Sequence, residues 1–472
     1  MEATYFYEGP LALSSMAAQA FLHFGISHSK KDEADFLFQV REGEGGMEGR
    51  LQGKKRKALW LADSPKAMAR CLMDHLSEMT GEPLGPWGYF LGMRPVKALF
   101  RFFPHETWKE ECAAFLKEEK VSPFLERLIM AVAEEERELI ISDSTAKGRR
   151  KAAFYVHVPF CPSHCLYCSF PAAIVKKGNA LDCYTDALIH DIGSAGKVLR
   201  EKKMTADSFY MGGGTPSILT AQQMERVLTA FSKAVPFSDD GEMTVEAGRP
   251  DTMEEALLDV LAAFGVTRLS INPQTMDDAI LRVISRSHRV SDIYDTFERV
   301  RRRPFHSVNM DFILGLPGET EKTVSENMDA ICQLRPENVT IHTLAIKRGS
   351  PFFGHEMMWN LPPEAALDQA VSAMHESLTA LGYQPYYLYR QKYMRDDFAN
   401  VGYTLSGHAS RYNIQMMGER QHVAGCGAGS VSKAVMPGGF RLRKQYMPHE
   451  PKVYMERLPL LETQRNRLWD GL

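Results

Sequence analysis

The sequence contains few cysteines and no long apolar run, and each shortage excludes a class of protein. Eight cysteines in 472 residues are too few for a disulfide framework, and three of them crowd together as metal ligands do. No apolar stretch approaches the roughly 20 residues of a membrane span. The N-terminus also lacks the basic and apolar segments of a secretion signal. We therefore expect a protein of the reducing cytoplasm, without a membrane span.

The charges are balanced, with 56 Lys and Arg against 59 Asp and Glu and a net charge of -3. A chain that binds nucleic acid through its phosphates needs an excess of positive charge, which is missing here. The length exceeds the roughly 250 to 300 residues at which a single core stops growing. Two or three domains are expected, and no nucleic-acid partner.

Residues 1–148 have the pattern of a small α+β domain. Residues 36–40 are typical of a strand, whereas 65–79 and 124–141 have helical periodicity. The charged stretch DSTAKGRRK at 143–151 has the composition of a linker, so we place a domain boundary after residue 148.

Residues 149–350 alternate short apolar segments with helical stretches. The apolar segments are 154–158, 208–211, 243–246, 268–271, 308–314 and 339–344. This alternation predicts repeated βα units with parallel strands, whose C-terminal ends face a shared ligand site. A helix at 363–381 and aromatic, glycine-rich sequence then follow, and we interpret 351–472 as a C-terminal region that covers the substrate.

Three cysteines, Cys161, Cys165 and Cys168, follow the first of these strands with gaps of three and two residues. Three thiolates can hold three irons of a cubane cluster, which leaves the fourth iron open to a ligand. The alternative is a structural zinc site with His164 as fourth ligand. No second cysteine pair or histidine pair follows at zinc-finger spacing, so we favour the cluster.

The CxxxCxxC spacing resembles the radical S-adenosylmethionine (SAM) superfamily, and GGGTP at 212–216 resembles its glycine-rich motif for the amino group of SAM. YVHVPFC, TVEAGRP, RLSINPQT, MDFILGLPGET and GCGAGSVS resemble the oxygen-independent coproporphyrinogen III oxidase family. WGYFLGMRPVK and YLYRQKYM are similar to its coproporphyrinogen dehydrogenase branch, which has a long N-terminal domain.

This resemblance implies an α/β fold: a partial (β/α)6 TIM-like barrel with an N-terminal α+β domain and a C-terminal mixed α/β region. It implies a [4Fe–4S] cluster and one or two SAM molecules. The implied reaction converts propionates of coproporphyrinogen III to the vinyl groups of protoporphyrinogen IX in haem biosynthesis, without oxygen. A 5′-deoxyadenosyl radical removes hydrogen from the propionate. The implied partners are the tetrapyrrole and a flavodoxin- or ferredoxin-type electron donor, and we expect a monomer.

The resemblance also assigns SAM contacts residue by residue. Tyr155, Gly213 and Glu246 match positions that contact the cluster-bound SAM. The positions that match contacts to a second SAM are Tyr167, Gly214, Thr215, Gln274, Arg286, Asp311, Ala345 and Val431. Gln274, Arg286 and Asp311 have structural alternatives, as local caps or pairing partners.

One position departs from the oxidase pattern. Phe170 stands where the oxidases carry a fourth cysteine, and this ending resembles the haem-chaperone branch. Two alternatives therefore stay open beside the oxidase: a haem chaperone, and a radical SAM methyltransferase or haem-ring-opening enzyme acting on tetrapyrroles.

A tetrapyrrole with four propionates needs an apolar cavity with a few cationic groups, because guanidinium and ammonium groups pair with carboxylates. Arg348, Arg390, Lys392 and Arg411 are the candidates for this role. The tyrosines near Arg390 either line such a pocket or belong to the core. These are Tyr383, Tyr386, Tyr387, Tyr389 and Tyr393.

Overall fold

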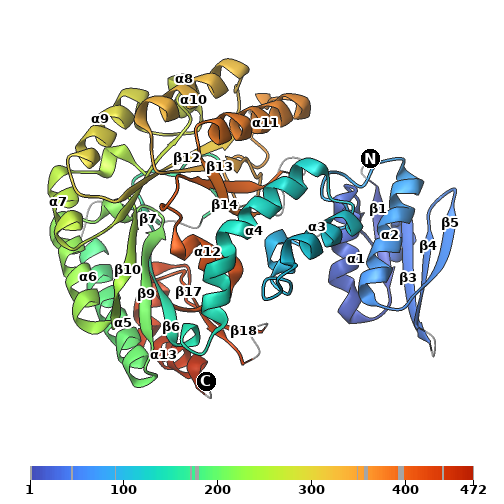
Figure 1. Ribbon diagram of the computed structural model, residues 1–472, viewed down its shortest axis with the longest axis horizontal. Helices are drawn as coiled ribbons and strands as arrows, with labels where there is room; N and C mark the ends of the chain where they lie inside the picture. Colours follow the sequence, from blue (N-terminus) through green and yellow to red (C-terminus); the bar gives the residue numbers. More distant parts are fainter. Residues whose placement is uncertain are drawn as a thin grey trace. The chain divides into compact units, whose positions relative to one another are not determined.

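The structure, a computed structural model, divides the chain into two compact units (Figure 1). The residues it describes are 3–43, 46–90, 92–170, 173–175, 180–347, 349–355, 360–391, 398–437 and 441–470. The first unit comprises Met1–Pro95 and His105–Met130, and the second comprises Val96–Pro104 and Ala131–Leu472. The boundary expected after residue 148 thus falls inside the second unit, which also contains all of 351–472.

The first unit is built on a five-stranded sheet in the order β2-β1-β3-β4-β5. Its strands are β1 (Thr4–Glu8), β2 (Ser27–His28), β3 (Phe36–Gly43), β4 (Gly46–Gln52) and β5 (Lys57–Ala62). Its helices are α1 (Leu11–His23), α2 (Pro65–Thr80) and α3 (Trp108–Glu118). Phe21, Phe38 and Leu72 are fully buried between sheet and helices. The strand expected at 36–40 and the helix expected at 65–79 are confirmed.

Helix α2 shows why the local sequence adopts this structure. The Ser64 side chain accepts a hydrogen bond from the backbone N–H of Ala67, and Pro65 occupies the first turn. Gly81 ends the helix with a φ of 80°, a conformation that glycine adopts without a steric penalty.

The second unit contains the six parallel strands that the sequence predicts, and they are neighbours in chain order. They are β6 (Lys151–Val158), β9 (Thr205–Gly213), β10 (Phe237–Glu246), β11 (Arg268–Gln274), β12 (Ser307–Leu314) and β13 (Asn338–Thr343). Each pair of neighbours is parallel. Their C-terminal ends therefore lie on one side of the sheet, where the motifs identified in the sequence follow.

Five further strands extend both ends of this sheet to eleven strands. They are β14 (Gln384–Tyr389), β15 (Asn400–Thr404), β16 (His422–Cys426), β17 (Val431–Val435) and β18 (Leu442–Tyr446). Strand β15 joins β13 antiparallel, whereas β16 joins β6 parallel. Separately, β7 (Phe160–Cys161) pairs with β8 (Ala173–Ile174) and carries the first cysteine.

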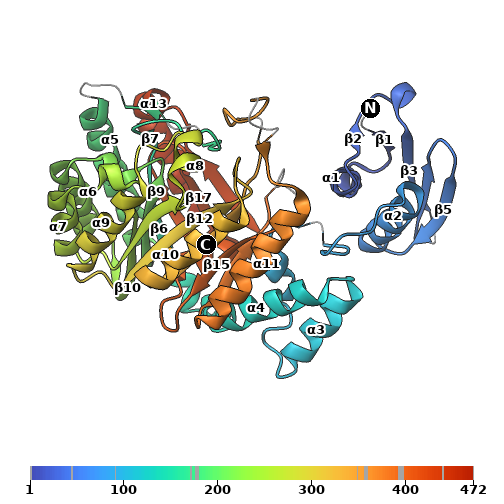
Figure 2. The same cartoon turned by 90° about the horizontal axis from the view of Figure 1, so that it is seen from above.

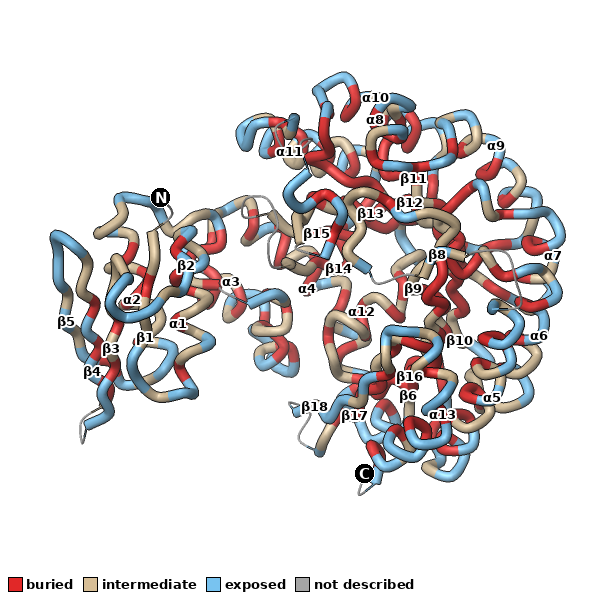
Figure 3. The backbone as a smooth tube through the Cα atoms, turned by 180° about the vertical axis from the view of Figure 1, so that it is seen from behind, coloured by how far each residue is buried: buried red, intermediate tan, exposed pale blue. Residues whose placement is uncertain are grey.

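The sheet curves, with helices along its outer side (Figures 1 and 2). The outer helices are α5 (Ala180–Glu201), α6 (Ala221–Ala234), α7 (Glu255–Ala263), α8 (Asp278–Val283), α9 (Val290–Arg301), α10 (Glu321–Leu334) and α11 (Glu364–Ala380). Helix α13 (Pro451–Asn466) packs on α5, and α4 (Pro123–Ser144) joins the two units. Figure 3 shows buried strands inside a ring of helices with exposed outer faces. This is the expected partial TIM-like barrel.

Helix α12 (Arg411–Gly418) lies on the inner face of the sheet, where Tyr412 packs with Ala153 and Val423. No helix in the described part of the chain is long and apolar enough to cross a membrane.

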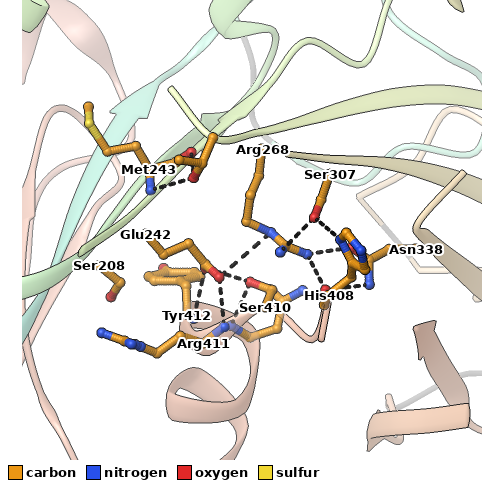
Figure 4. A network of polar contacts seen from close by, with 12 residues as sticks. Ser208, Glu242, Met243, Arg268, Ser307, Asn338, His408, Ser410, Arg411 and Tyr412 are labelled. Carbon is orange, nitrogen blue, oxygen red and sulfur yellow. Dashed lines mark hydrogen bonds and ion pairs between the residues drawn. The ribbon is translucent and has the colours of Figure 1, made fainter. Parts of the chain in front are cut away.

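A polar network centred on Arg268 holds the segment before α12 against the N-terminal ends of β10 to β13 (Figure 4). Arg268 donates hydrogen bonds to Ser307, to Asn338 and to the carbonyl of His408, the last at 2.7 Å. Its Nε lies 3.6 Å from the carboxylate of Glu242. That carboxylate also accepts the first backbone N–H groups of α12, an arrangement favoured at a helix N-terminus.

Replacing Arg268 with methionine should destabilise the second unit by roughly 3 to 5 kcal/mol, because Glu242 and Asn338 would lose a buried ionic partner. Urea denaturation followed by far-UV circular dichroism would measure the free energy of unfolding. Arg302→Ala is a matched control, since Arg302 and its partner Glu298 are both exposed. Equal stability of the two variants would contradict a stabilising role for the network.

Candidate active site

The three cysteines of the motif lie on one loop after β6, and main-chain hydrogen bonds fix that loop. The N–H of Leu166 donates to the carbonyl of Ile284 at 3.0 Å, and the carbonyl of Leu166 accepts from Phe352 at 3.0 Å. The N–H of Cys168 donates to the carbonyl of Cys165 at 3.1 Å. Cys165 is buried, whereas the other two thiols are partly accessible.

Cationic and hydroxyl donors surround the thiols. Arg249 is 3% exposed, and its guanidinium donates to Cys165 Sγ at 2.9 Å and to Ser163 Oγ at 2.7 Å. The hydroxyl of Thr215 donates to Cys161 Sγ at 3.4 Å. Burial raises the pKa of the Cys161 thiol, and the Thr215 hydrogen bond and nearby guanidinium charges oppose that effect. Such donors stabilise thiolates, the form that binds iron.

The donor set fits the iron–sulfur cluster that the sequence predicts. The ligands are soft thiols, and hydrogen bonds to sulfur and nearby positive charge offset the negative charge of a thiolate-bound cluster. His164, the fourth ligand of the alternative zinc site, is exposed. No group of three or more His, Cys, Asp or Glu among the described residues is arranged to hold a single metal ion. A cubane differs from such a site, because each of its protein sulfurs binds a different iron.

The glycines at the end of β9 are required by close contacts. Gly213 has a φ of +113°, and a Cβ there would lie 2.7 Å from the ring of His157. A Cβ at Gly214 would lie 2.5 Å from the carbonyl oxygen of Phe160. The N–H of Gly214 donates to the Val158 carbonyl at 2.8 Å, and Thr215 is buried. The glycine run thus brings backbone that carries no side chains close to the cysteine loop.

Glu246 ends β10 beside this glycine run. It accepts a hydrogen bond from the Tyr210 hydroxyl at 2.6 Å and one from the N–H of Gly213 at 3.3 Å. Burial raises the pKa of Glu246 to about 7, although the Tyr210 hydrogen bond opposes the effect, and the charge of Asp311 raises it further. A carboxyl group with a pKa near 7 is partly protonated at neutral pH, and a cation that binds beside it favours the ionised form.

Tyr155 and His157 are alternate residues of β6, so their side chains lie on the same face of the strand, and both line a cavity. The Tyr155 hydroxyl and His157 Nδ1 are 3.0 Å apart. Tyr155 stacks on Tyr412, which stacks on Tyr210 with ring centroids 4.2 Å apart. Burial lowers the pKa of His157 to about 4, with a contribution from His449, so the ring is neutral at pH 7.

Two of the residues expected to contact a second SAM lie in the wall of this cavity. Asp311 and Val431 line the same cavity as Tyr155 and Glu246. Asn309 donates to Asp311 at 2.7 Å. Burial alone would raise the pKa of Asp311, but His342 and Asn309 outweigh it and hold the pKa below its ordinary value.

Four other residues expected to contact a second SAM do not line this cavity. Arg286 is buried and donates to the carbonyl of Asn272 at 3.1 Å, while its Nε has no hydrogen-bond partner among the described residues. Gln274 is buried with a φ of 71°, an unusual backbone conformation for glutamine. Tyr167 packs against Ile280 and its apolar neighbours. Ala345 is partly buried just after β13.

A cavity of about 560 Å³ occupies the inside of the curved sheet. Its walls include Tyr386, Tyr387 and Tyr389 of β14, although Tyr386 and Tyr387 are also buried in the core. Tyr383 instead donates a hydrogen bond to the carbonyl of Pro336 and is not among the lining residues. Tyr393 falls outside the described residues.

The two expected substrate anchors that the structure describes, Arg390 and Arg411, do not line this cavity. Arg411 contacts Asp207 and Asp240, and like the partly buried Arg390 it is not among the lining residues. Lys392 and Arg348 fall outside the described residues. The cations that line the cavity in the described part of the chain are Arg268, Lys433 and Lys444, which the sequence interpretation did not select.

Several further residues at the site were missed from sequence. Arg249 follows Glu246 by three positions, in a motif already singled out, but nothing in that motif indicates a contact with sulfur. Tyr210 precedes the glycine run on the same strand, and this position was the available signal. Tyr412 and Lys433 come from distant parts of the chain, so only the fold reveals them.

Comparisons with known proteins agree with this geometry. The Radical SAM superfamily model matches residues 155–331. The oxygen-independent coproporphyrinogen-III oxidase-like protein HemZ of Bacillus subtilis is 34% identical over 377 residues, which cover 79% of this chain and 74% of that protein. The heme chaperone HemW of Lactococcus lactis is 32% identical over 278 residues, or 58% of this chain and 68% of that protein.

Among solved structures, coproporphyrinogen III oxidase (HemN) from Escherichia coli, a radical SAM enzyme, is similar with a TM-score of 0.56. The two chains are 22% identical, and the match covers 70% of this chain and 73% of the other. This similarity supports the assignment of the fold.

Proposed function

The chain belongs to the oxygen-independent coproporphyrinogen-III oxidase-like family of radical SAM proteins, and from this premise we propose that it decarboxylates coproporphyrinogen III. Two propionates become vinyl groups, which gives protoporphyrinogen IX without oxygen. The observation that carries this proposal is the cavity of about 560 Å³, which falls within the range of pockets that enclose ligands. Its lining includes Tyr155 and Glu246, beside the glycine run, together with tyrosine, methionine and lysine side chains from other parts of the chain.

The residues of the site have distinct tasks in this proposal. Cys161, Cys165 and Cys168 hold the [4Fe–4S] cluster, and Gly213 and Glu246 bind and orient SAM. When bound, the cluster and SAM supply a 5′-deoxyadenosyl radical, a reagent that removes hydrogen atoms. The packed tyrosines Tyr155, Tyr210 and Tyr412 restrict water around the reacting groups.

The conversion of each propionate removes two electrons and one proton as carbon dioxide leaves. One electron and the proton leave together as a hydrogen atom, which SAM-derived deoxyadenosine retains. The second electron goes to an external acceptor. Because SAM must first be reduced by one electron, the reaction also needs a donor, for which a flavodoxin- or ferredoxin-type protein is the proposed partner.

SAM affinity should depend on pH through Glu246. Burial raises the pKa of this carboxyl from 4.5 to about 7, so the folded protein favours its protonated form. That preference stabilises the fold at pH values below 4.5, and the stabilisation is lost as the pH rises toward 7. A SAM cation favours the ionised form, so binding should strengthen as pH rises from 6 to 8. The gain relative to Glu246→Gln should be up to tenfold per pH unit below 7. Isothermal titration calorimetry at several pH values measures the SAM affinity of both proteins. Identical pH profiles for wild type and Glu246→Gln would show that Glu246 does not bind SAM through its charge.

The proposed function is tested by anaerobic incubation of cluster-loaded protein with a reductant, SAM and coproporphyrinogen III, followed by mass analysis. We expect a tetrapyrrole that has lost two carboxyl groups and two molecules of 5′-deoxyadenosine for each. Deoxyadenosine without any decarboxylated tetrapyrrole would overturn the proposal. A methylated or linear tetrapyrrole would instead indicate the methyltransferase or ring-opening alternative.

The haem chaperone remains the second candidate, and Phe170 is the observation that favours it. This residue replaces the fourth cysteine of the oxidase pattern, is 61% exposed and lines the cavity. Tight haem binding with transfer to an acceptor protein, and no vinyl product, would select this function.

A further inference from the structure

Three lysines surround one carboxylate at the side of the cavity formed by β17 and β18. The Nζ atoms of Lys97, Lys433 and Lys444 lie 2.9, 3.5 and 3.6 Å from carboxylate oxygens of Glu419. The Glu419 side chain is 11% exposed and that of Lys433 is 10% exposed. Three ammonium groups thus lie around one largely buried carboxylate.

The sheet itself brings two of these lysines together. Lys433 of β17 and Lys444 of β18 are direct cross-strand partners. Like charges at directly opposed positions destabilise a strand pair, so this pairing has a cost that Glu419 reduces by lying close to both ammonium groups. Both lysines line the cavity, where a second carboxylate would reduce the remaining repulsion.

The negative and positive side chains that line the cavity lie in different parts of its wall. Glu246 and Asp311 contribute carboxylates near the ends of β10 and β12, and a ligand carboxylate placed there would be repelled. Arg268, the other lining cation among the described residues, is already held by Glu242, Ser307 and Asn338. The lysine pair is therefore the position in the described walls that best accepts an anionic group.

We propose that Lys433 and Lys444 form a carboxylate-binding subsite that holds a propionate of the tetrapyrrole while a different propionate faces the SAM end of the cavity. The walls beside the lysines are largely apolar and include Met416, Met417 and Val431. The Lys433 side chain is 10% exposed, and partial burial of this kind strengthens an ammonium–carboxylate pair relative to one in bulk water. The inference rests on the proposed function and names the groups that recognise its substrate.

Binding of coproporphyrin III, the fluorescent oxidised form of the substrate, tests this subsite. Fluorescence titration of the cluster-loaded protein under anaerobic conditions would compare wild type with Lys433→Met and Lys444→Met. Each substitution should weaken binding by about tenfold or more, because it removes one charge-assisted hydrogen bond. Lys452→Met is the matched control, since Lys452 is 77% exposed on α13, and it should bind like wild type.

A second probe separates recognition of charge from damage to the cavity. The tetramethyl ester of coproporphyrin III has the same ring and no carboxylates, so wild type and both lysine variants should bind it equally. Parallel loss of the acid and the ester would show that the lysines only support the fold, and unchanged affinity for the acid would also overturn the proposal. Lys444→Met decides the matter if Lys433→Met does not fold, because the Lys444 side chain is 36% exposed.

Failure of the subsite and failure of the proposed function give different results. If wild type decarboxylates coproporphyrinogen III but the lysine variants bind coproporphyrin normally, only the subsite is wrong. If binding depends on the lysines but no carboxylate is lost, the subsite stands and the proposed reaction is wrong. If wild type binds no coproporphyrin and also removes no carboxyl group from coproporphyrinogen III, both are wrong.

Discussion

Cys165→Ala should abolish the iron–sulfur cluster and, with it, all reductive cleavage of SAM. Two remaining thiolates hold a cubane poorly, and Cys165 is the buried thiol to which Arg249 donates. Iron and sulfide analysis after anaerobic reconstitution, together with the visible absorption of the cluster, would measure its content. We expect near-complete loss of iron, in contrast to partial effects from changes around the cluster.

Cys183→Ala serves as the control for this experiment, because Cys183 is an exposed thiol on α5 outside the motif. It should retain the wild-type iron content and SAM cleavage. A Cys165→Ala protein with full iron content and normal SAM cleavage would show that the three-cysteine loop does not hold the cluster.

Glu246→Gln should weaken SAM binding by roughly 10- to 100-fold while the cluster stays in place. The substitution keeps the size of the side chain but removes the charge that a SAM cation would meet, a loss of about 1.5 to 3 kcal/mol. The measurement is SAM affinity by isothermal titration of the cluster-loaded protein, with iron content determined in parallel.

Glu254→Gln is the matched control for Glu246. Glu254 is exposed, precedes α7 and makes no side-chain cap, so its substitution should leave SAM affinity unchanged. If Glu246→Gln bound SAM as tightly as this control, Glu246 would have no part in holding SAM. Loss of iron in Glu246→Gln would instead indicate a structural role near the cysteine loop.

The six parallel strands were predictable from sequence because strands packed under helices form short, largely apolar segments that alternate with helical stretches. The ligand loops were predictable for a related reason: cysteine and glycine motifs stand directly after those strands. The two ends of the sheet were not predictable in the same way. Strands β14 to β18 pair antiparallel or return to β6 over a long distance in sequence, and no local pattern reveals such pairings.

The cations that would bind a substrate carboxylate were also not predictable from local sequence patterns. Arg411 has suitable chemistry for a carboxylate, but it begins α12 and its guanidinium contacts Asp207 and Asp240. Lys433 and Lys444 are ordinary lysines in sequence, and only the register of β17 with β18 places them side by side in the cavity wall. The sequence shows the sign of a side chain's charge, but it does not show which residue that side chain pairs with in the folded protein.

The most direct test of the account uses coproporphyrinogen III labelled with deuterium on the β-carbons of its propionates. Cluster-loaded protein, reductant and SAM are incubated with it anaerobically, and the 5′-deoxyadenosine is analysed by mass spectrometry. We expect one deuterium in the deoxyadenosine for each propionate converted to a vinyl group. Deoxyadenosine that contains no deuterium, with the labelled tetrapyrrole recovered intact, would contradict it.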